Sequence, residues 1–408
     1  MYFYFFLIII YVILFKYLKL KYYIIASFVL SMSIFIISMN SLENIIESKD
    51  IEKCPFCYGL TACYLMDINE LSFDYSDLSV LFSNYFGTKN VYYVKMRNKK
   101  LILKQLASNS ELDEFDKMSI VFREKKDINF LNLIKEIVST NMSDTLSKLR
   151  LCPTTKNIKL FLANVINSKN FSYQNIWTLL KINPEALMLQ ILPARLGWPV
   201  PKYYGACGRL VIEEFVGPAL SEFYNKHWIQ RAEIASSLLN AAHTFTFQDE
   251  NFTYYLTDVS FDNIAVDSNN IAKFIDLENV IVVDKKTSIA DQSETWKDVH
   301  RSDSDFGCED CLIFSPSDIC AHEVSDHNYY TICKHILARK TTENQISEGF
   351  LHDVPDNILS QYPVFINLVN KCSKSDTLSN RITTGIKLNI LLKDIIKMYT
   401  LSYNHHNR

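Results

Sequence analysis

The sequence has little net charge. Its 42 Lys and Arg residues nearly balance 45 Asp and Glu residues, which gives a formal charge of -3 over 408 residues. Such a composition provides no bulk attraction to nucleic acid, so nucleic-acid partners are not predicted. Internal repeats and low-complexity tracts are also lacking. The length allows one large globular domain or two.

No apolar run reaches the roughly 20 residues of a full membrane span. Two shorter runs, 1–15 and 24–39, each fit a signal-peptide core or a short anchor. Lys16, Lys19 and Lys21 precede the second run and supply the positive flank that stays cytoplasmic. We therefore predict that residues 1–40 are a signal sequence or type II anchor, and that the chain after them lies in the lumen or outside. A buried N-terminal helix pair is the alternative.

The cysteines agree with a secretory location. Their number is even, and they lie at Cys54, Cys57, Cys63, Cys152, Cys207, Cys308, Cys311, Cys320, Cys333 and Cys372. Disulfides are the default after a secretory segment. The alternatives are a zinc site made by the two Cys-x-x-Cys pairs at 54–57 and 308–311, or a redox-active pair. Three sequons predict glycosylation at Asn141, Asn170 and Asn251.

The order of elements predicts two lobes. A polar stem, 41–53, leads into a Cys-rich segment and a β-rich lobe with a helical insertion, 54–217, followed by a helical lobe, 218–408. The expected elements are a hairpin at 90–106, a helix capped by Ser108 or Ser110, helices within 125–190, two strands within 197–217, a long helix from 228, short strands within 254–282, and helices among cysteine-rich loops within 285–400. This is an α+β arrangement, and the cleft between two such lobes is a natural ligand site.

Lys104 ends an apolar strand, where a lysine can contact the phosphates of a nucleotide. Glu111 and Glu114 open the next helix and are candidate ion-pair partners for it. The alternatives are a solvated lysine at a strand end and acidic residues that complement the helix dipole.

Asp258, Asn263 and Asp276 form the second candidate group. The Asp-x-x-x-x-Asn spacing lets one loop present two oxygen-bearing side chains, and a short strand then delivers Asp276. Carboxylate and amide oxygens suit Mg²⁺ or Mn²⁺. Each residue alone could be ordinary turn chemistry. A glycosidase that uses Asp258 and Asp276 is a further, weaker alternative.

The ordered set resembles the divergent protein kinase domain family of the secretory pathway, deleted-in-autism type (divergent protein kinase domain 2). The similar segments are "CPFCYG" at 54–59, "LILKQL" at 101–106, "LGWPVPKYYGACGR" at 196–209, "YYLTDVSFDNIAV" at 254–266, "IDLENV" at 275–280, "DHNYY" at 326–330 and "FLHDVP" at 350–355. The resemblance implies a two-lobed protein-kinase-like fold, with a small β-rich N-lobe, a larger helical C-lobe and disulfide-rich luminal extensions. It also implies residence in the endoplasmic reticulum or Golgi lumen, membrane-anchored or secreted.

The resemblance also implies residue roles. Lys104 would contact phosphate, Asp258 would be the catalytic base, and Asn263 and Asp276 would hold the metal. Glu213 or Glu214 would lie in the hinge beside the adenine of ATP.

Several positions depart from the kinase pattern. Leu256-Thr257 replaces the usual His-Arg, Ser260 replaces a lysine, and Glu278 replaces the glycine of Asp-Phe-Gly. Only Gly87 stands near the place of a Gly-rich loop, and no Ala-Pro-Glu element follows Asp276. Glu278 could add a metal-facing carboxylate or cap the turn.

Two functions follow as hypotheses. The first is an atypical kinase that binds ATP with Mg²⁺ or Mn²⁺ and transfers phosphate to a protein or glycan hydroxyl. The second is a secreted or Golgi pseudokinase that acts as a growth-signalling ligand or vesicle-trafficking factor. Predicted partners are the nucleotide, a luminal or secreted protein substrate or a cell-surface receptor, and the membrane where the N-terminal segment is uncleaved.

Overall fold

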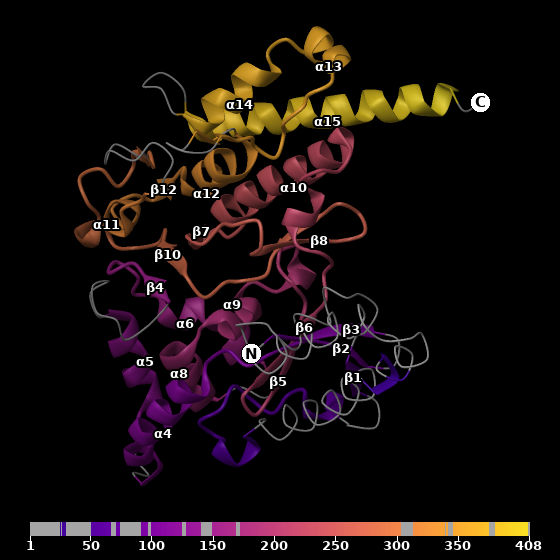
Figure 1. Ribbon diagram of the computed structural model, residues 1–408. Coiled ribbons are helices and arrows are strands. Elements are labelled where there is room, and N and C mark those ends of the chain that lie inside the picture. Colours follow the sequence, from indigo (N-terminus) through magenta and orange to yellow (C-terminus); the bar gives the residue numbers. More distant parts are fainter. Residues whose placement is uncertain are drawn as a thin grey trace. The chain divides into compact units, whose positions relative to one another are not determined.

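The computed structural model (Figure 1) describes most of the chain after residue 49. The described residues are 25, 27–29, 50–66, 71–73, 91–96, 99–124, 128–139, 149–168, 172–302, 313–338, 340–341, 346–374 and 380–406. The predicted signal or anchor lies almost wholly outside them, as do Gly87, Asn141, Asn170, Cys308 and Cys311. The chain divides into two compact units: Met1–Leu112 with Tyr204–Phe215 (unit 1), and Asp113–Tyr203 with Val216–Arg408 (unit 2).

Unit 1 is built on a five-stranded sheet of order β1-β2-β3-β6-β5. The strands are β1 (Leu71–Phe73), β2 (Val91–Met96), β3 (Lys99–Lys104), β5 (Tyr203–Cys207) and β6 (Leu210–Glu214). β2 and β3 pair antiparallel, with Tyr92 opposite Leu103, which confirms the predicted hairpin at 90–106. β3 also pairs antiparallel with β6, so strands distant in sequence meet in one sheet.

One apolar face of this sheet forms the core of unit 1. Leu101 and Leu103 alternate along β3 and are buried with Leu210 and Ile212 of the neighbouring hairpin. The period of two is what a half-buried strand requires. The short turn η1 (Ile51–Lys53) ends the stem, and η2 (Cys63–Leu65) belongs to the Cys-rich segment that packs against this core.

The Cys-rich segment is tied to the sheet by covalent and close contacts. A disulfide joins Cys63 to Cys207, and a second joins Cys54 to Cys57. Gly205 has φ +140°, and a Cβ there would lie 2.5 Å from Thr61 Oγ1, so this approach requires glycine. Because Cys54 and Cys57 are bonded to each other, the zinc alternative that uses their thiolates is wrong.

Helices of residues 113–203 cluster in unit 2, whereas the sequence placed them as an insertion in the N-lobe. They are α4 (Asn109–Glu124, which starts in unit 1), α5 (Phe130–Ser139), α6 (Ile158–Phe161), α7 (Ala163–Ile166), α8 (Tyr173–Ile182) and α9 (Glu185–Ile191), followed by the turn η3 (Ala194–Leu196). The buried Trp177 of α8 contacts Phe115, Phe122 and Phe130 at ring distances of 4.9–5.8 Å. This aromatic cluster joins α4, α5 and α8.

The remainder of unit 2 surrounds the long helix α10 (Trp228–Phe247). Its strands are β4 (Arg150–Leu151), β7 (Phe252–Leu256), β8 (Ile264–Val266), β9 (Ala272–Phe274), β10 (Val280–Asp284), β11 (Val299–His300), β12 (Val324–Ser325), β13 (Lys340–Thr341) and β14 (Ile346–Ser347). Its other helices and turns are η4 (Leu220–Phe223), η5 (Ile289–Asp291), α11 (Pro316–Cys320), α12 (His327–Thr331), the π-helical η6 (Ile332–Leu337), α13 (Asp356–Gln361), α14 (Phe365–Ser373) and α15 (Arg381–His406). α10 packs along α15 (Figure 1). It is the long helix that the sequence predicts from residue 228.

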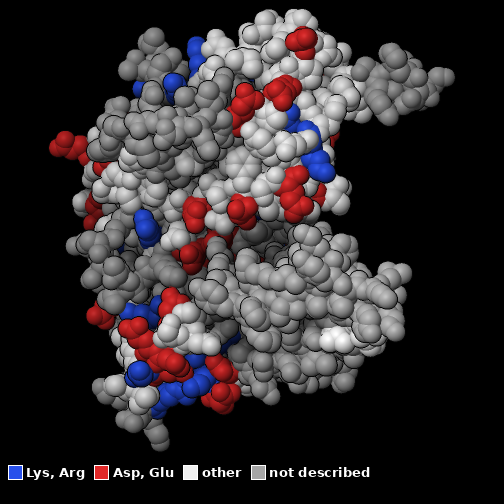
Figure 2. Space-filling view, in the orientation of Figure 1, with Lys and Arg blue, Asp and Glu red and all other residues white. Residues whose placement is uncertain are grey.

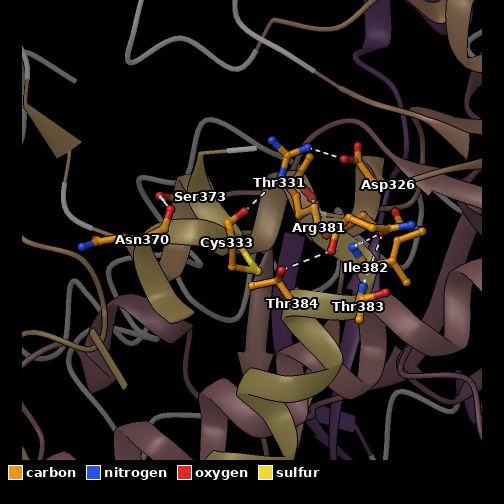
Figure 3. Close-up of a disulfide and its surroundings, with 12 residues drawn as sticks. Asp326, Thr331, Cys333, Asn370, Ser373, Arg381, Ile382, Thr383 and Thr384 are labelled. Carbon is orange, nitrogen blue, oxygen red and sulfur yellow. Dashed lines mark hydrogen bonds and ion pairs between the residues drawn. A yellow bond between two sulfur atoms is a disulfide. The ribbon is translucent and has the colours of Figure 1, made fainter. Parts of the chain in front are cut away.

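Two disulfides and a buried ion pair connect the elements of unit 2. Cys152 bonds to Cys320, and Cys333 bonds to Cys372. Beside the second disulfide, the buried guanidinium of Arg381 donates to Asp326 (Figure 3). The default prediction of disulfides is thus confirmed for the eight cysteines that the structure describes.

Among the described residues, no helix combines the length and apolar character needed to cross a membrane.

Candidate functional site

Strand β7 delivers the first candidate residues to one end of a small sheet in unit 2. All five residues of β7 are buried, and Leu256 pairs with Val280 of β10. Two residues of α12 contact the end of this strand. The side chain of Asn328 accepts a hydrogen bond from Leu256 N at 3.0 Å, and His327 Nε2 lies 3.1 Å from Leu256 O. Both the backbone N–H and the carbonyl of Leu256 therefore have partners on α12, two residues before Asp258.

The loop from Asp258 to Asn263 closes on itself. Val259 is buried and anchors it, while Asp258 is exposed. Asn263 N donates to Ser260 Oγ at 3.2 Å, and Asn263 Nδ2 donates to the carbonyl of Asp258 at 3.3 Å. The predicted Asp-x-x-x-x-Asn spacing thus forms one tight loop. Ser260 acts here as a turn residue, through its hydroxyl.

The β8–β9 hairpin brings Asn263 next to the second acidic segment. Ile264 pairs with Phe274, and Ile275 N donates to Asn263 O at 3.0 Å. Asp276 follows directly after Ile275. The antiparallel register thereby returns Asn263 and Asp276 to the same end of the hairpin, as the strand between them predicts.

The Asp276–Glu278 turn separates the roles of its two carboxylates. Asp276 Oδ1 accepts the backbone N–H of Glu278 at 3.3 Å, so Asp276 caps the turn. The Glu278 carboxylate instead accepts from Asn183 Nδ2 at 2.6 Å and from Asn279 Nδ2 at 3.2 Å. Asp276, and not Glu278, therefore caps this turn. The Glu278 carboxylate is oriented by the side-chain amides of Asn183 and Asn279.

Acidic side chains gather on the described surface in this part of unit 2. Figure 2 shows Asp and Glu atoms over the region that β7, β8 and β10 occupy in Figure 1. Asp258 and Asp262 are exposed, and Asp262 accepts from Ser221 Oγ at 3.0 Å. Oxygen donors are therefore abundant at this end of the β8–β9 hairpin.

Comparison with known proteins shows which family the chain is similar to. The family model described as the protein-kinase domain of FAM69 matches residues 176–375. Divergent protein kinase domain 2A of Xenopus tropicalis is 34% identical over 76% of this chain and 79% of that protein. The human protein of the same name is 32% identical over the same shares. Human divergent protein kinase domain 2B is 30% identical over 39% of this chain and 36% of its own length.

The chain belongs to the divergent protein kinase domain 2 family.

Membership confirms the predicted kinase-like α+β fold, with a five-stranded sheet in unit 1 and most of the helices in unit 2. A solved structure of vaccinia related kinase 3 aligns with 77% of this chain and 85% of that chain at 11% identity, with a TM-score of 0.33.

The family motif "FLHDVP" packs beside the candidate catalytic loop. The ring of Phe261 lies 5.9 Å from that of Phe350 and 6.1 Å from that of Tyr224. Arg231 of α10 donates to the carbonyls of Phe350 and His352 at 2.7 and 2.9 Å. The motif therefore supports the loop that carries Asp258 and Asn263.

Lys104 lies at the end of β3 in unit 1, where it forms a buried ion pair. Its Nζ is 3.1 Å from Glu213 Oε2, and the side chains are 11% and 1% exposed. The sequence placed Glu213 or Glu214 in a hinge, but both residues end strand β6, and Lys104 pairs with Val211 in the ladder. A contact of either glutamate with adenine stays a prediction.

The two glutamates of α4 have a different setting. Glu111 Oε2 accepts from Ser108 N at 2.8 Å and Ser108 Oγ accepts from Glu111 N at 3.4 Å, which is a capping box. This confirms the predicted cap at Ser108, and ion pairing of Glu111 or Glu114 with Lys104 stays a prediction. Glu114 is exposed on the same helix. Asn251, the one described sequon, lies partly buried between α10 and β7.

The sequence did not reveal the buried residues that hold the loops. Burial lowers the pKa of His327 to about 3, so this imidazole is neutral near pH 7. Asn328 also donates to Tyr254 O at 2.8 Å. The "DHNYY" segment signalled both residues as part of a motif, without their role. Asn183 lay in no motif.

Proposed function

We propose that this chain binds ATP with Mg²⁺ or Mn²⁺ and transfers the γ-phosphoryl group to a protein or glycan hydroxyl. The observation that carries the proposal is the end of the β8–β9 hairpin, where Asn263 O accepts from Ile275 N beside Asp276. Kinase chemistry consists mainly of positioning and charge stabilisation, and it needs these residue types in this order.

The donor set fits a hard divalent cation. Asn263 and Asp276 supply an amide and a carboxylate oxygen, and Glu278, two residues after Asp276, supplies a second carboxylate. Oxygen ligands of this kind suit Mg²⁺ and Mn²⁺. When bound, such an ion would neutralise charge on the phosphates. Asp258, exposed on the loop before Asn263, would orient the acceptor hydroxyl and take its proton.

Lys104 is the proposed phosphate contact. Its ion pair with Glu213 holds the ammonium group at a fixed place on the sheet of unit 1. An ammonium group contacts a phosphate oxygen through charge-assisted hydrogen bonds.

A pseudokinase that binds nucleotide without catalysis is the second candidate. Two observations favour it: the Ser260 hydroxyl serves the loop turn where kinases carry a lysine, and the buried Leu256 stands in place of the catalytic-loop histidine. In that case the protein would act as a secreted or Golgi signalling or trafficking factor.

Thermal-shift measurements on the purified full-length protein test the proposal. ATP with Mn²⁺ should raise the melting temperature, and Asp276→Asn should remove that rise. A parent protein without any nucleotide-dependent shift would exclude both candidates. Transfer of labelled phosphate that is lost in Asp258→Ala would then separate the kinase from the binder.

The endoplasmic reticulum or Golgi lumen is the proposed location. The four disulfides among the described residues support it, because such bonds persist in oxidising compartments. A shift in electrophoretic mobility on glycosidase treatment would support this location if the shift is lost when Asn141, Asn170 and Asn251 are replaced. Unmodified protein with free thiols in the cytosol would refute it.

A further inference from the structure

Asn183 occupies a rigid junction between two buried helices of unit 2. It follows α8 and precedes Pro184 and α9, and its extended backbone (φ -161°, ψ 119°) is what a residue before proline prefers. Its side chain is 5% exposed. Both helices bury most of their residues, so the junction has little freedom to move.

The side-chain amide of Asn183 has one orientation that satisfies both of its neighbours. Its Oδ1 accepts the backbone N–H of Glu185 at 2.9 Å, and its Nδ2 donates to Glu278 Oε2 at 2.6 Å. A backbone N–H can only donate and an ionised carboxylate can only accept, so a flipped amide would lose both bonds. The junction therefore presents a fixed donor to Glu278.

A hydrogen-bonded chain continues from Glu278 to the catalytic loop. Asn279 Nδ2 donates to Glu278 Oε1 at 3.2 Å, and the hydroxyl of Thr257 donates to Asn279 O. Thr257 directly precedes Asp258. One amide donor contacts each oxygen of the Glu278 carboxylate, so the two donors together restrict how this carboxylate can turn.

We infer that Asn183 is a positioning residue for the metal site, which fixes the Glu278 carboxylate beside Asp276. The inference rests on the proposed function. It assigns a metal-directed role to a contact that joins positions 95 residues apart. The competing explanation is that the contact only fastens the helix pair to the loop. Partners of metal ligands usually change metal affinity when they are replaced, which separates the two.

The test uses Asn183→Ser in the full-length protein. A serine hydroxyl at this position can still accept from Glu185 N, as Asn183 Oδ1 does, but the amide donor to Glu278 is lost. The Mn²⁺ concentration that gives half of the thermal shift, at fixed saturating ATP, should rise about 10-fold or more. Glu278→Ala should raise it at least as much. Asn269→Ser, on the exposed turn of the β8–β9 hairpin, is the matched control and should behave as the parent.

The other outcomes are decisive. An Mn²⁺ dependence in Asn183→Ser equal to that of the parent, while Asp276→Asn loses the shift, would overturn the inference and leave the proposed function intact. A parent without a shift would instead overturn the proposed function. Should Asn183→Ser fail to fold, Glu278→Gln replaces it, because its amide oxygen still accepts from Asn183. That variant should show the same rise in Mn²⁺ requirement, and parental Mn²⁺ dependence would contradict the inference.

Discussion

Replacing Asn328 with alanine should destabilise unit 2 by about 3 kcal/mol. Asn328 is fully buried, and its side chain makes three hydrogen bonds, with Leu256 N, Tyr254 O and Thr246 Oγ1, at 2.8–3.0 Å. Each buried polar group left without its partner costs about 1–3 kcal/mol. The lower value, about 1 kcal/mol for each of the three partners, applies here because β7 keeps its backbone ladder with β10.

Denaturant unfolding measures the loss, and hydrogen exchange locates it. The amide of Leu256 should exchange faster in Asn328→Ala, because its side-chain acceptor is gone. Asn357→Ala, at an exposed position of helix α13, is the matched control and should stay within about 0.5 kcal/mol of the parent. A stability of Asn328→Ala equally close to the parent, with unchanged exchange at Leu256, would refute the view that α12 holds the strand before the catalytic loop.

Three further predictions concern buried charges, acid stability and disulfides. Glu213→Ala should cost about 3 kcal/mol because it removes the ion-pair partner of the buried Lys104, and Lys104→Met with Glu213→Leu should cost less than Glu213→Ala in the same denaturant assay. His327 has a pKa of about 3 in the folded protein, so only the unfolded chain binds its proton near pH 6. His327 should therefore contribute a fall of about 1 kcal/mol in the free energy of unfolding from pH 7 to 5.5, and the total fall should shrink by about this amount in His327→Gln. Joint replacement of Cys63 and Cys207 by serine, which opens a loop of 144 residues, should cost up to about 5 kcal/mol. Removal of the other described disulfide of unit 1 should cost about 2 kcal/mol or less, and equal losses would contradict the loop-closure explanation.

Local features of the fold could be predicted because they depend on neighbouring residues. The β2–β3 hairpin follows from two apolar runs around a polar turn, and the cap of α4 follows from the Ser108 and Glu111 spacing. The loop from Asp258 to Asn263 follows from its own turn residues.

Contacts between distant segments could not be predicted in the same way. The ion pair of Lys104 with Glu213 depends on the pairing of β3 with β6, which local patterns do not specify. The partner of Asn183 is decided by how the α8–α9 junction meets the Asp276–Glu278 turn. Cysteine pairing was likewise open, since ten cysteines permit many connectivities.

The most direct measurement is the melting temperature of the full-length protein with and without ATP and Mn²⁺, for the parent and for Asp276→Asn. We predict a rise in the parent that depends on both ATP and Mn²⁺, and no rise in Asp276→Asn, whose carboxylate charge is lost. An identical rise in both proteins, or none in the parent, would contradict the claim that the end of the β8–β9 hairpin holds a metal–nucleotide complex.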